Sequence, residues 1–112
     1  MPVYCLAKAE DVSNVSIHKT QINQAKAMSI TVFGMVQGVG FRYYVFQQAR
    51  VYSIGGWVTN MQDRTVVIHC EGSEQNMKEF LKMVEQGPSH AKVEALEVVS
   101  AEVEHHSIFR IV

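Results

Sequence analysis

The chain has 112 residues, of which 47% are hydrophobic and 19% charged, and its formal net charge is -1. These values are typical of one globular domain and exclude a disordered or fibrous chain. The near-neutral balance gives no reason to expect nucleic acid as a partner. The apolar runs are too short for a transmembrane helix, so no membrane partner is expected either.

The N-terminal stretch MPVYCLAKAEDV lacks the basic and apolar regions of a signal peptide. Two cysteines, Cys5 and Cys70, are too few for a disulfide framework, and no CxxC pair is present. A cytoplasmic location is therefore expected. Cys70 is interpreted as a small buried hydrophobic residue, while a pairing with Cys5 stays open.

Residues 1–27 mix polar residues with single apolar ones and show no sustained period. This pattern predicts a weakly ordered N-terminal extension in front of a domain at residues 28–112. Val15 and Ile17 could add a short strand to it.

The first predicted strand begins at Ser29, where Ile30 and Val32 alternate with their neighbours, and it ends at Gly34. A helix is predicted after the next loop, because apolar residues recur at spacings of four and three. These residues are Phe41, Val45, Ala49 and Tyr52. The helix should end before the glycine pair at positions 55–56.

A hairpin is predicted next. WVTN at 57–60 ends one strand, MQDR at 61–64 forms the turn, and TVVIHC at 65–70 is a β-branched strand. Asp63 is interpreted as a turn residue rather than a general base.

Ser73 is expected to cap a second helix, which Gly87-Pro88 should end. The buried face of this helix should hold Met77, Phe80, Leu81 and Val84. The next predicted strand has a slip in its alternation that indicates a bulge, seen at Val93, Leu96 and Val98. IFRIV at 108–112 is expected to close the chain as a short strand.

The order of elements is strand, helix, strand, strand, helix, strand, with a possible short fifth strand. It predicts an α+β, ferredoxin-like sandwich (βαββαβ) whose antiparallel sheet carries both helices on one face. The order alone indicates no function, because this fold hosts many.

The loop before the first helix, in MVQGVGFRYYVF at 35–46, is unusual in carrying Gly38 and Gly40 directly before Arg42. It is neither a Walker A loop, which ends in Gly-Lys-Ser/Thr, nor a dinucleotide fingerprint, which would need glycine where Tyr43 stands. Free N–H groups at a helix start favour an anion, and Arg42 can add two parallel donors. The stretch predicts a cradle for a tetrahedral oxyanion, although a plain turn followed by a solvated arginine stays open from this stretch alone.

GMVQGVGFR and GWVTNMQD together resemble the acylphosphatase family over about residues 29–112, as do Gly87-Pro88-Ser89 and Ala91-Lys92-Val93. The resemblance implies hydrolysis of a small-molecule acyl phosphate, without cofactor or metal, by a monomer that inorganic phosphate inhibits competitively as product. It implies that Arg42 holds the phosphate and Asn60 positions the attacking water. The backbone of the phosphate-binding loop would come from Gln37, Gly38, Val39, Gly40 and Phe41.

The chemistry of the two motifs agrees with that implication. Neither contains Cys or His to attack phosphorus, and the amide of Asn60 is no base. Such a site suits a leaving group that needs no proton, and a carboxylate qualifies because carboxylic acids ionise near pKa ~4. Two departures from the family pattern are Arg64, where glycine is usual, and the ending FRIV, which puts in doubt any brace of Arg42 by a terminal carboxylate.

Two alternatives stay open. One is a non-catalytic module that senses an anion or another ligand on the same fold. The other is a relative of the acylphosphatase-like domain of hydrogenase-maturation proteins, against which the absence of a further domain in 112 residues argues.

The five histidines show no helical metal-ligand spacing, and no metal site is expected. His105 and His106 should point to opposite faces of a strand. The aromatic residues Tyr43, Tyr44 and Phe46 are interpreted as core and rim, and Trp57 as packing.

Overall fold

The computed structural model describes residues 25–112. The expectations for Val15, Ile17 and Cys5, and for nearly all of the extension, lie outside these residues. The elements are β1 (Lys26–Met35), α2 (Phe41–Val51), β2 (Gly55–Asn60), β3 (Val66–Gly72), α3 (Glu74–Gln86), β4 (Lys92–Ala101) and β5 (Phe109–Ile111).

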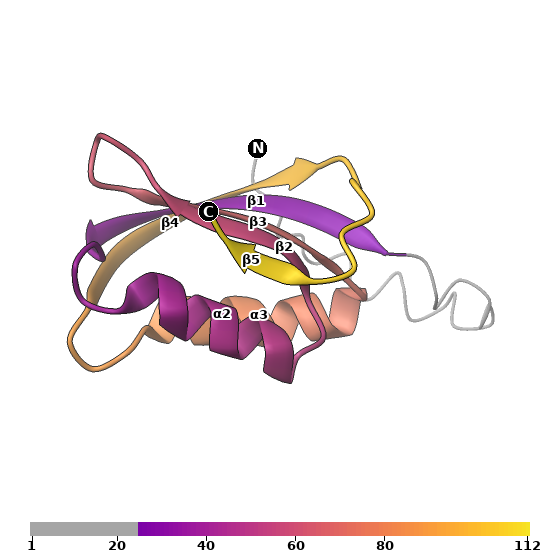
Figure 1. The fold of residues 1–112 in the computed structure, drawn as a ribbon, viewed down its shortest axis with the longest axis horizontal. Coiled ribbons are helices and arrows are strands. Elements are labelled where there is room, and N and C mark those ends of the chain that lie inside the picture. Colours follow the sequence, from indigo (N-terminus) through magenta and orange to yellow (C-terminus); the bar gives the residue numbers. More distant parts are fainter. Residues whose placement is uncertain (1–24) are drawn as a thin grey trace.

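The five strands form one sheet in the order β4-β1-β3-β2-β5. The pairs β1–β3, β1–β4 and β2–β3 are antiparallel, as predicted, and β5 adds a parallel pair with β2. Both helices cover the same face of this sheet (Figure 1). The predicted ferredoxin-like fold is confirmed, and so is the fifth strand. In residues 25–112, no helix has the length and apolar character that crossing a membrane requires.

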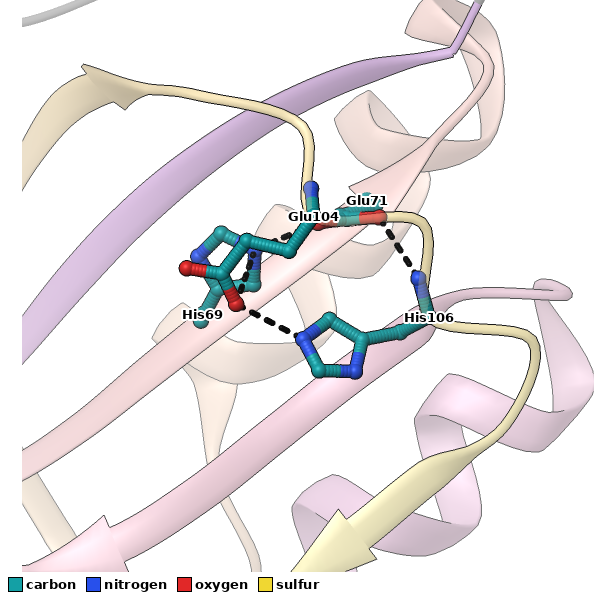
Figure 2. Close-up of side chains that lie close together, drawn as sticks. All are labelled: His69, Glu71, Glu104 and His106. Carbon is teal, nitrogen blue, oxygen red and sulfur yellow. Dashed lines mark hydrogen bonds and ion pairs between the residues drawn. The ribbon is translucent and has the colours of Figure 1, made fainter.

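The sheet face opposite the helices is partly covered by the 102–108 loop, the segment that joins β4 to β5 (Figure 2). The carboxylate of Glu71 on β3 accepts backbone hydrogen bonds from Glu104 and His106 of this loop. Gly55 lets the loop approach closely, because a Cβ there would collide with the carbonyl of His106. His105 and His106 therefore lie in a loop, and the expectation that they alternate along a strand is wrong.

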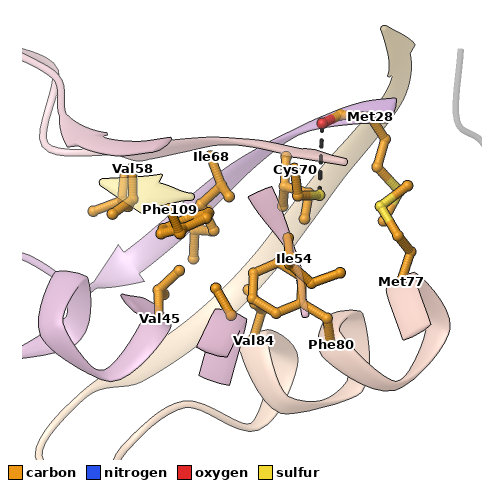
Figure 3. Packing of buried hydrophobic residues seen from close by; sticks show 14 of the residues in the cluster. Met28, Val45, Ile54, Val58, Ile68, Cys70, Met77, Phe80, Val84 and Phe109 are labelled. Carbon is orange, nitrogen blue, oxygen red and sulfur yellow. Dashed lines mark hydrogen bonds between the residues drawn. The ribbon is translucent and has the colours of Figure 1, made fainter. Parts of the chain in front are cut away.

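The core lies between the sheet and the two helices (Figure 3). Alternate residues of the strands point toward the helices. The helices pack against them with apolar side chains at the predicted spacings. The helical members are Phe41, Val45 and Ala49 of α2 and Met77, Phe80 and Val84 of α3. Each fully buried Val, Phe or Met side chain among them contributes about 1.5–3 kcal/mol relative to exposure. Cys70 belongs to the core, as expected, and its thiol donates to the carbonyl of Met28 at 3.6 Å.

Helix α3 begins after Ser73 and ends before Gly87, as the sequence predicts. Ser73 Oγ accepts a hydrogen bond from the backbone N–H of Asn76 at 3.1 Å, and Gly87 ends the helix with φ 68°. A left-handed residue at the end of a helix is typically glycine, because glycine has no Cβ to clash.

Strand β1 is longer than predicted, since it begins at Lys26 and continues through Gly34 to Met35. Gly34 does not end the strand. Its φ of 132° and its lack of a Cβ let β4 approach closely where the pairing register shifts. Phe33 pairs with Ala95 and Gly34 with Val93, so Glu94 is the extra residue and the predicted bulge in β4 is confirmed.

Candidate active site

The loop between β1 and α2 is held against the core by Val36, which is only 1% exposed. Beyond it, Gly38 and Gly40 both adopt left-handed backbone, with φ of 75° and 80°. A Cβ at either position would meet nothing within 4 Å. These glycines are therefore required by the backbone conformation, which costs other residues about 1–2 kcal/mol, and the space above the loop is open.

Helix α2 begins at Phe41, as predicted, with Gly40 as its N-cap. No side chain accepts a hydrogen bond at this cap, and the first turn holds no acidic residue. The first N–H groups of a helix have no partner within the helix, and the helix dipole is positive at this end. The start of α2 is therefore suited to an anion.

A hollow of about 170 Å³ opens at this helix start. A single water needs only about 10–15 Å³, so the hollow has room for a larger group. Its lining contains no carboxylate, thiol or imidazole; the residues are Val36, Gly38, Gly40, Phe41, Arg42, Tyr43 and Ile111. The structure thus brings Gly38, Gly40 and Phe41 of the predicted loop together with Arg42 and adds Ile111 of β5. Gln37 and Val39 do not line the hollow.

Arg42 is the one charged residue that lines this hollow. Its side chain is half-buried, and it forms no ion pair within residues 25–112, with the terminal carboxylate or otherwise. The end of the chain is held instead by a backbone hydrogen bond from Val112 to the carbonyl of Val58 at 2.9 Å. The guanidinium of Arg42 is therefore not neutralised by a protein carboxylate, which favours an anionic ligand.

Asn60 is the last residue of β2 and, two positions after the buried Val58, shares the helix-facing side of the sheet. Its Oδ1 is buried and has no hydrogen-bond partner among the described residues. A buried polar atom left unpaired costs about 1–3 kcal/mol. The unpaired Oδ1 of Asn60 is therefore suited to bind a ligand or a water molecule. Asn60 does not line the hollow itself.

Gln37 connects the loop to the hairpin that follows Asn60. Its Nε2 donates to the carbonyl oxygens of Met61 and Thr65, each at 2.9 Å. The sequence assigned only a backbone role to Gln37. No local signal indicates this contact, because the partners lie 24 and 28 residues further along the chain.

The hairpin turn is closed by backbone hydrogen bonds from Met61 to Thr65 and from Arg64 to Met61. Asp63 is a turn residue, as predicted: its Oδ1 accepts from the Thr65 hydroxyl at 2.6 Å and from the Thr65 N–H at 3.1 Å. These bonds, the hydroxyl first, hold the pKa of Asp63 below its ordinary value. Arg64 has a φ of 77°, which explains why glycine would suit this position.

The aromatic residues beside the site are packing residues. Tyr44 donates from its hydroxyl to the carbonyl of Met83 at 2.8 Å, which ties α2 to α3. Burial, and to a smaller degree the neighbouring Tyr52, raises the pKa of Tyr44. Tyr43 is 58% exposed at the rim and stacks on Phe46.

Comparisons with known proteins agree with this geometry. The family model of acylphosphatase matches residues 28–111. An acylphosphatase of Archaeoglobus fulgidus is 42% identical over 85 residues, which cover 76% of this chain and 96% of the relative.

Solved structures give the same result. The crystal structure of acylphosphatase from Bacillus subtilis is 39% identical with a TM-score of 0.76, and the match covers 78% of this chain and 98% of that one. A structure of full-length HypF is 33% identical with a TM-score of 0.73, covering 81% of this chain but 12% of that one. The fold and the glycine loop define a small α+β domain whose first helix begins at a site suited to an anion. The chain belongs to the acylphosphatase family.

Proposed function

We propose that the protein hydrolyses acyl phosphates to a carboxylate and inorganic phosphate, by direct attack of water on phosphorus. The observation that carries this proposal is the hollow at the start of α2, which combines Arg42 with open backbone N–H groups and lacks a nucleophilic side chain. Such a site binds and stabilises a phosphate group but cannot form a covalent intermediate with it.

In this proposal the phosphate lies over Gln37, Gly38, Val39, Gly40 and Phe41, and Arg42 contacts it with charge-assisted hydrogen bonds. Each such bond is worth about 1.5–3 kcal/mol. Asn60 positions the water through its carboxamide, whose Oδ1 is buried and has no partner within residues 25–112. Gln37 keeps Asn60 near the loop, because it binds the carbonyl of the next residue, Met61.

The leaving group decides the substrate class. No residue that lines the hollow has a carboxyl or imidazole to protonate a departing oxygen. A carboxylate leaves without a proton at neutral pH, whereas the alkoxide of a phosphomonoester does not. We further propose that the protein acts in the cytoplasm as a monomer and that inorganic phosphate is a competitive inhibitor.

A comparison of two substrates tests the proposal. Benzoyl phosphate and glycerol 2-phosphate, an alkyl phosphomonoester, are each offered to the full chain, with and without a chelator. Turnover of benzoyl phosphate alone, unchanged by the chelator, is expected. Turnover of neither compound, together with binding of inorganic phosphate, would favour a non-catalytic module that senses an anion.

A further inference from the structure

Four side chains gather on the sheet face that carries no helix. His69 and Glu71 belong to β3, and Glu104 and His106 belong to the 102–108 loop (Figure 2). One donor atom from each of these four residues lies within 4.8 Å of the others. This arrangement, which we call the His2Glu2 cluster, is separate from the hollow at Arg42, because none of its members lines that hollow.

The donor atoms of the cluster are close enough to share one ion, and two pairs of them are hydrogen-bonded to each other. His69 Nε2 lies 2.6 Å from Glu71 Oε2 and 3.6 Å from Glu104 Oε1, and His106 Nε2 lies 2.7 Å from the same Glu104 oxygen. Ligand atoms about 2.0–2.2 Å from a tetrahedral ion are roughly 3.3–3.6 Å apart. The two shortest contacts would therefore have to lengthen by about 0.6–1 Å for the four atoms to surround an ion.

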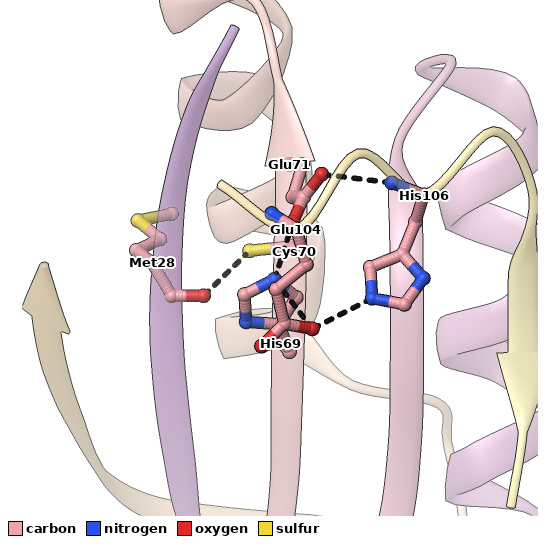
Figure 4. A network of polar contacts seen from close by, with 6 residues as sticks. All are labelled: Met28, His69, Cys70, Glu71, Glu104 and His106. Atoms are coloured by element: carbon pink, nitrogen blue, oxygen red, sulfur yellow. Dashed lines mark hydrogen bonds and ion pairs between the residues drawn. The ribbon is translucent and has the colours of Figure 1, made fainter. Parts of the chain in front are cut away.

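The cluster is held in place by its surroundings. The side chains of His69 and Glu71 are only 5% and 4% exposed. Trp57 stacks on the His69 ring at 5.7 Å, and the His106 ring meets it edge-on at 5.5 Å. Glu71 also accepts the backbone hydrogen bonds that fix the loop, and these bonds bring the donor atoms of β3 and the loop together (Figure 4).

The donor set selects the class of ion. Two imidazole nitrogens and two carboxylate oxygens suit Zn²⁺ and its first-row neighbours, whereas Mg²⁺ and Ca²⁺ prefer oxygen donors alone. The two carboxylates carry two negative charges, which a divalent ion would neutralise. Glu71 accepts backbone hydrogen bonds from Glu104 and His106, as expected of an ionised carboxylate.

We propose that the His2Glu2 cluster binds one divalent transition-metal ion and so fastens the 102–108 loop to β3. On binding, each neutral imidazole coordinates the ion through Nε2, and the single proton of the ring lies on Nδ1. The site is structural. It stabilises the connection to β5 and takes no part in hydrolysis, so the inference does not depend on the proposed function.

The members of this cluster lack the helical spacing of three or four residues that indicates a pair of metal ligands in a sequence. On a strand, residues two apart share a face, and His69 and Glu71 meet that condition. Glu104 and His106 show the same spacing, but only the path of the loop brings the two pairs together.

Zinc titration of the full chain, first freed of metal with a chelator, tests the proposal. Calorimetry gives the stoichiometry, and fluorescence reports on the site because Trp57 is the chain's one tryptophan and stacks on His69. One ion per chain is expected, with a change in Trp57 emission and a rise in melting temperature that chelator reverses.

Matched variants locate the binding. His106→Asn and Glu104→Gln remove ligands, whereas His105→Asn and Glu102→Gln make the same changes at exposed neighbours. Asn suits position 105 because His105 has a φ of 65°. The ligand variants should lose affinity for Zn²⁺ by more than the roughly 10–100-fold that loss of an outer-shell partner costs, and the controls should bind as the parent does.

Two results would overturn the proposal. One is the absence of binding at one ion per chain in the parent. The other is binding that His106→Asn and Glu104→Gln leave unchanged, which would place the ion elsewhere. Glu104 is 51% exposed, so Glu104→Gln is expected to fold, and melting without metal checks that each variant is native.

Discussion

The carboxamide nitrogen of Gln37 lies 2.9 Å from the carbonyl oxygen of Thr65, across 28 residues of sequence. With a second bond to the Met61 carbonyl, it joins the loop before Arg42 to the hairpin after Asn60. In the proposed mechanism Arg42 binds the phosphate and Asn60 orients the water. The two hydrogen bonds of Gln37 therefore help to fix the relative position of Arg42 and Asn60.

Replacing Gln37 with methionine should lower stability and activity together. Gln37→Met keeps the side-chain length but removes both donors, each worth about 0.5–1.5 kcal/mol, so the free energy of unfolding should fall by about 1–2 kcal/mol. Misplacement of the water should lower kcat by about tenfold or more. Urea melts and acyl phosphate kinetics measure the two effects. Gln47→Met, at an exposed position of α2, should change neither, and a fully active Gln37→Met would show that the link does not position the site.

Removing the guanidinium should weaken both binding and turnover. Arg42→Ala leaves the hollow without its one charged residue, so inhibition by inorganic phosphate should weaken by at least tenfold and kcat should fall as well. Arg110→Ala makes the same change in net charge at an exposed position of β5 and serves as the control. Normal inhibition of Arg42→Ala by phosphate would contradict the proposed phosphate site.

Asn60→Ala should separate activity from stability. Because Oδ1 is buried and lacks a partner within residues 25–112, its removal should leave stability unchanged or raise it by up to about 1 kcal/mol. The kcat should nevertheless fall by roughly 10²-fold, with phosphate inhibition changed by no more than about twofold, since the side chain is proposed to orient water only. If turnover survived while phosphate affinity was lost, Asn60 would not be the residue that orients the water.

Arg64→Gly should stabilise the protein. Arg64 has a φ of 77° at an exposed turn position, and a left-handed backbone costs a non-glycine residue about 1 kcal/mol. Denaturant melts should show a gain of about that size. Gln62→Gly, at a neighbouring exposed position without positive φ, should lower stability instead, because glycine there only adds freedom to the unfolded chain. A loss of stability in Arg64→Gly would mean that the Arg64 side chain contributes more than the strain costs.

The pKa of Asp63 should depend on the Thr65 hydroxyl. That hydrogen bond is the largest cause of a pKa below the ordinary value of 3.8, so its contribution to the turn is present above pH 3.8 and is lost as pH falls through the lowered pKa. Thr65→Val should move the pKa of Asp63, followed by NMR titration, back toward 3.8. Thr65→Ser keeps the hydroxyl and should retain the low value. Equal pKa values in the two variants would assign the shift to the backbone N–H instead.

The periodic parts of the fold were predictable from the sequence. Helical spacing of Phe41, Val45 and Ala49 and alternation around Ile30 follow from local backbone geometry, and each element was confirmed. The start of β1 was misplaced because Lys26 and Ala27 carry no alternating pattern, and pairing with β3 and β4 alone extends the strand to them.

The glycine loop and the charge of Arg42 were set by the sequence itself, because backbone freedom and charge are properties of single residues. Three features were decided only by the tertiary structure: the reach of Gln37 to Thr65, the buried orphan oxygen of Asn60, and the meeting of β3 with the 102–108 loop in the His2Glu2 cluster. The first and the third join positions far apart in the chain, and the second depends on which residues surround Asn60 in the fold. Contacts of that kind depend on how strands pair and which face a loop crosses, and no local pattern of residues encodes them.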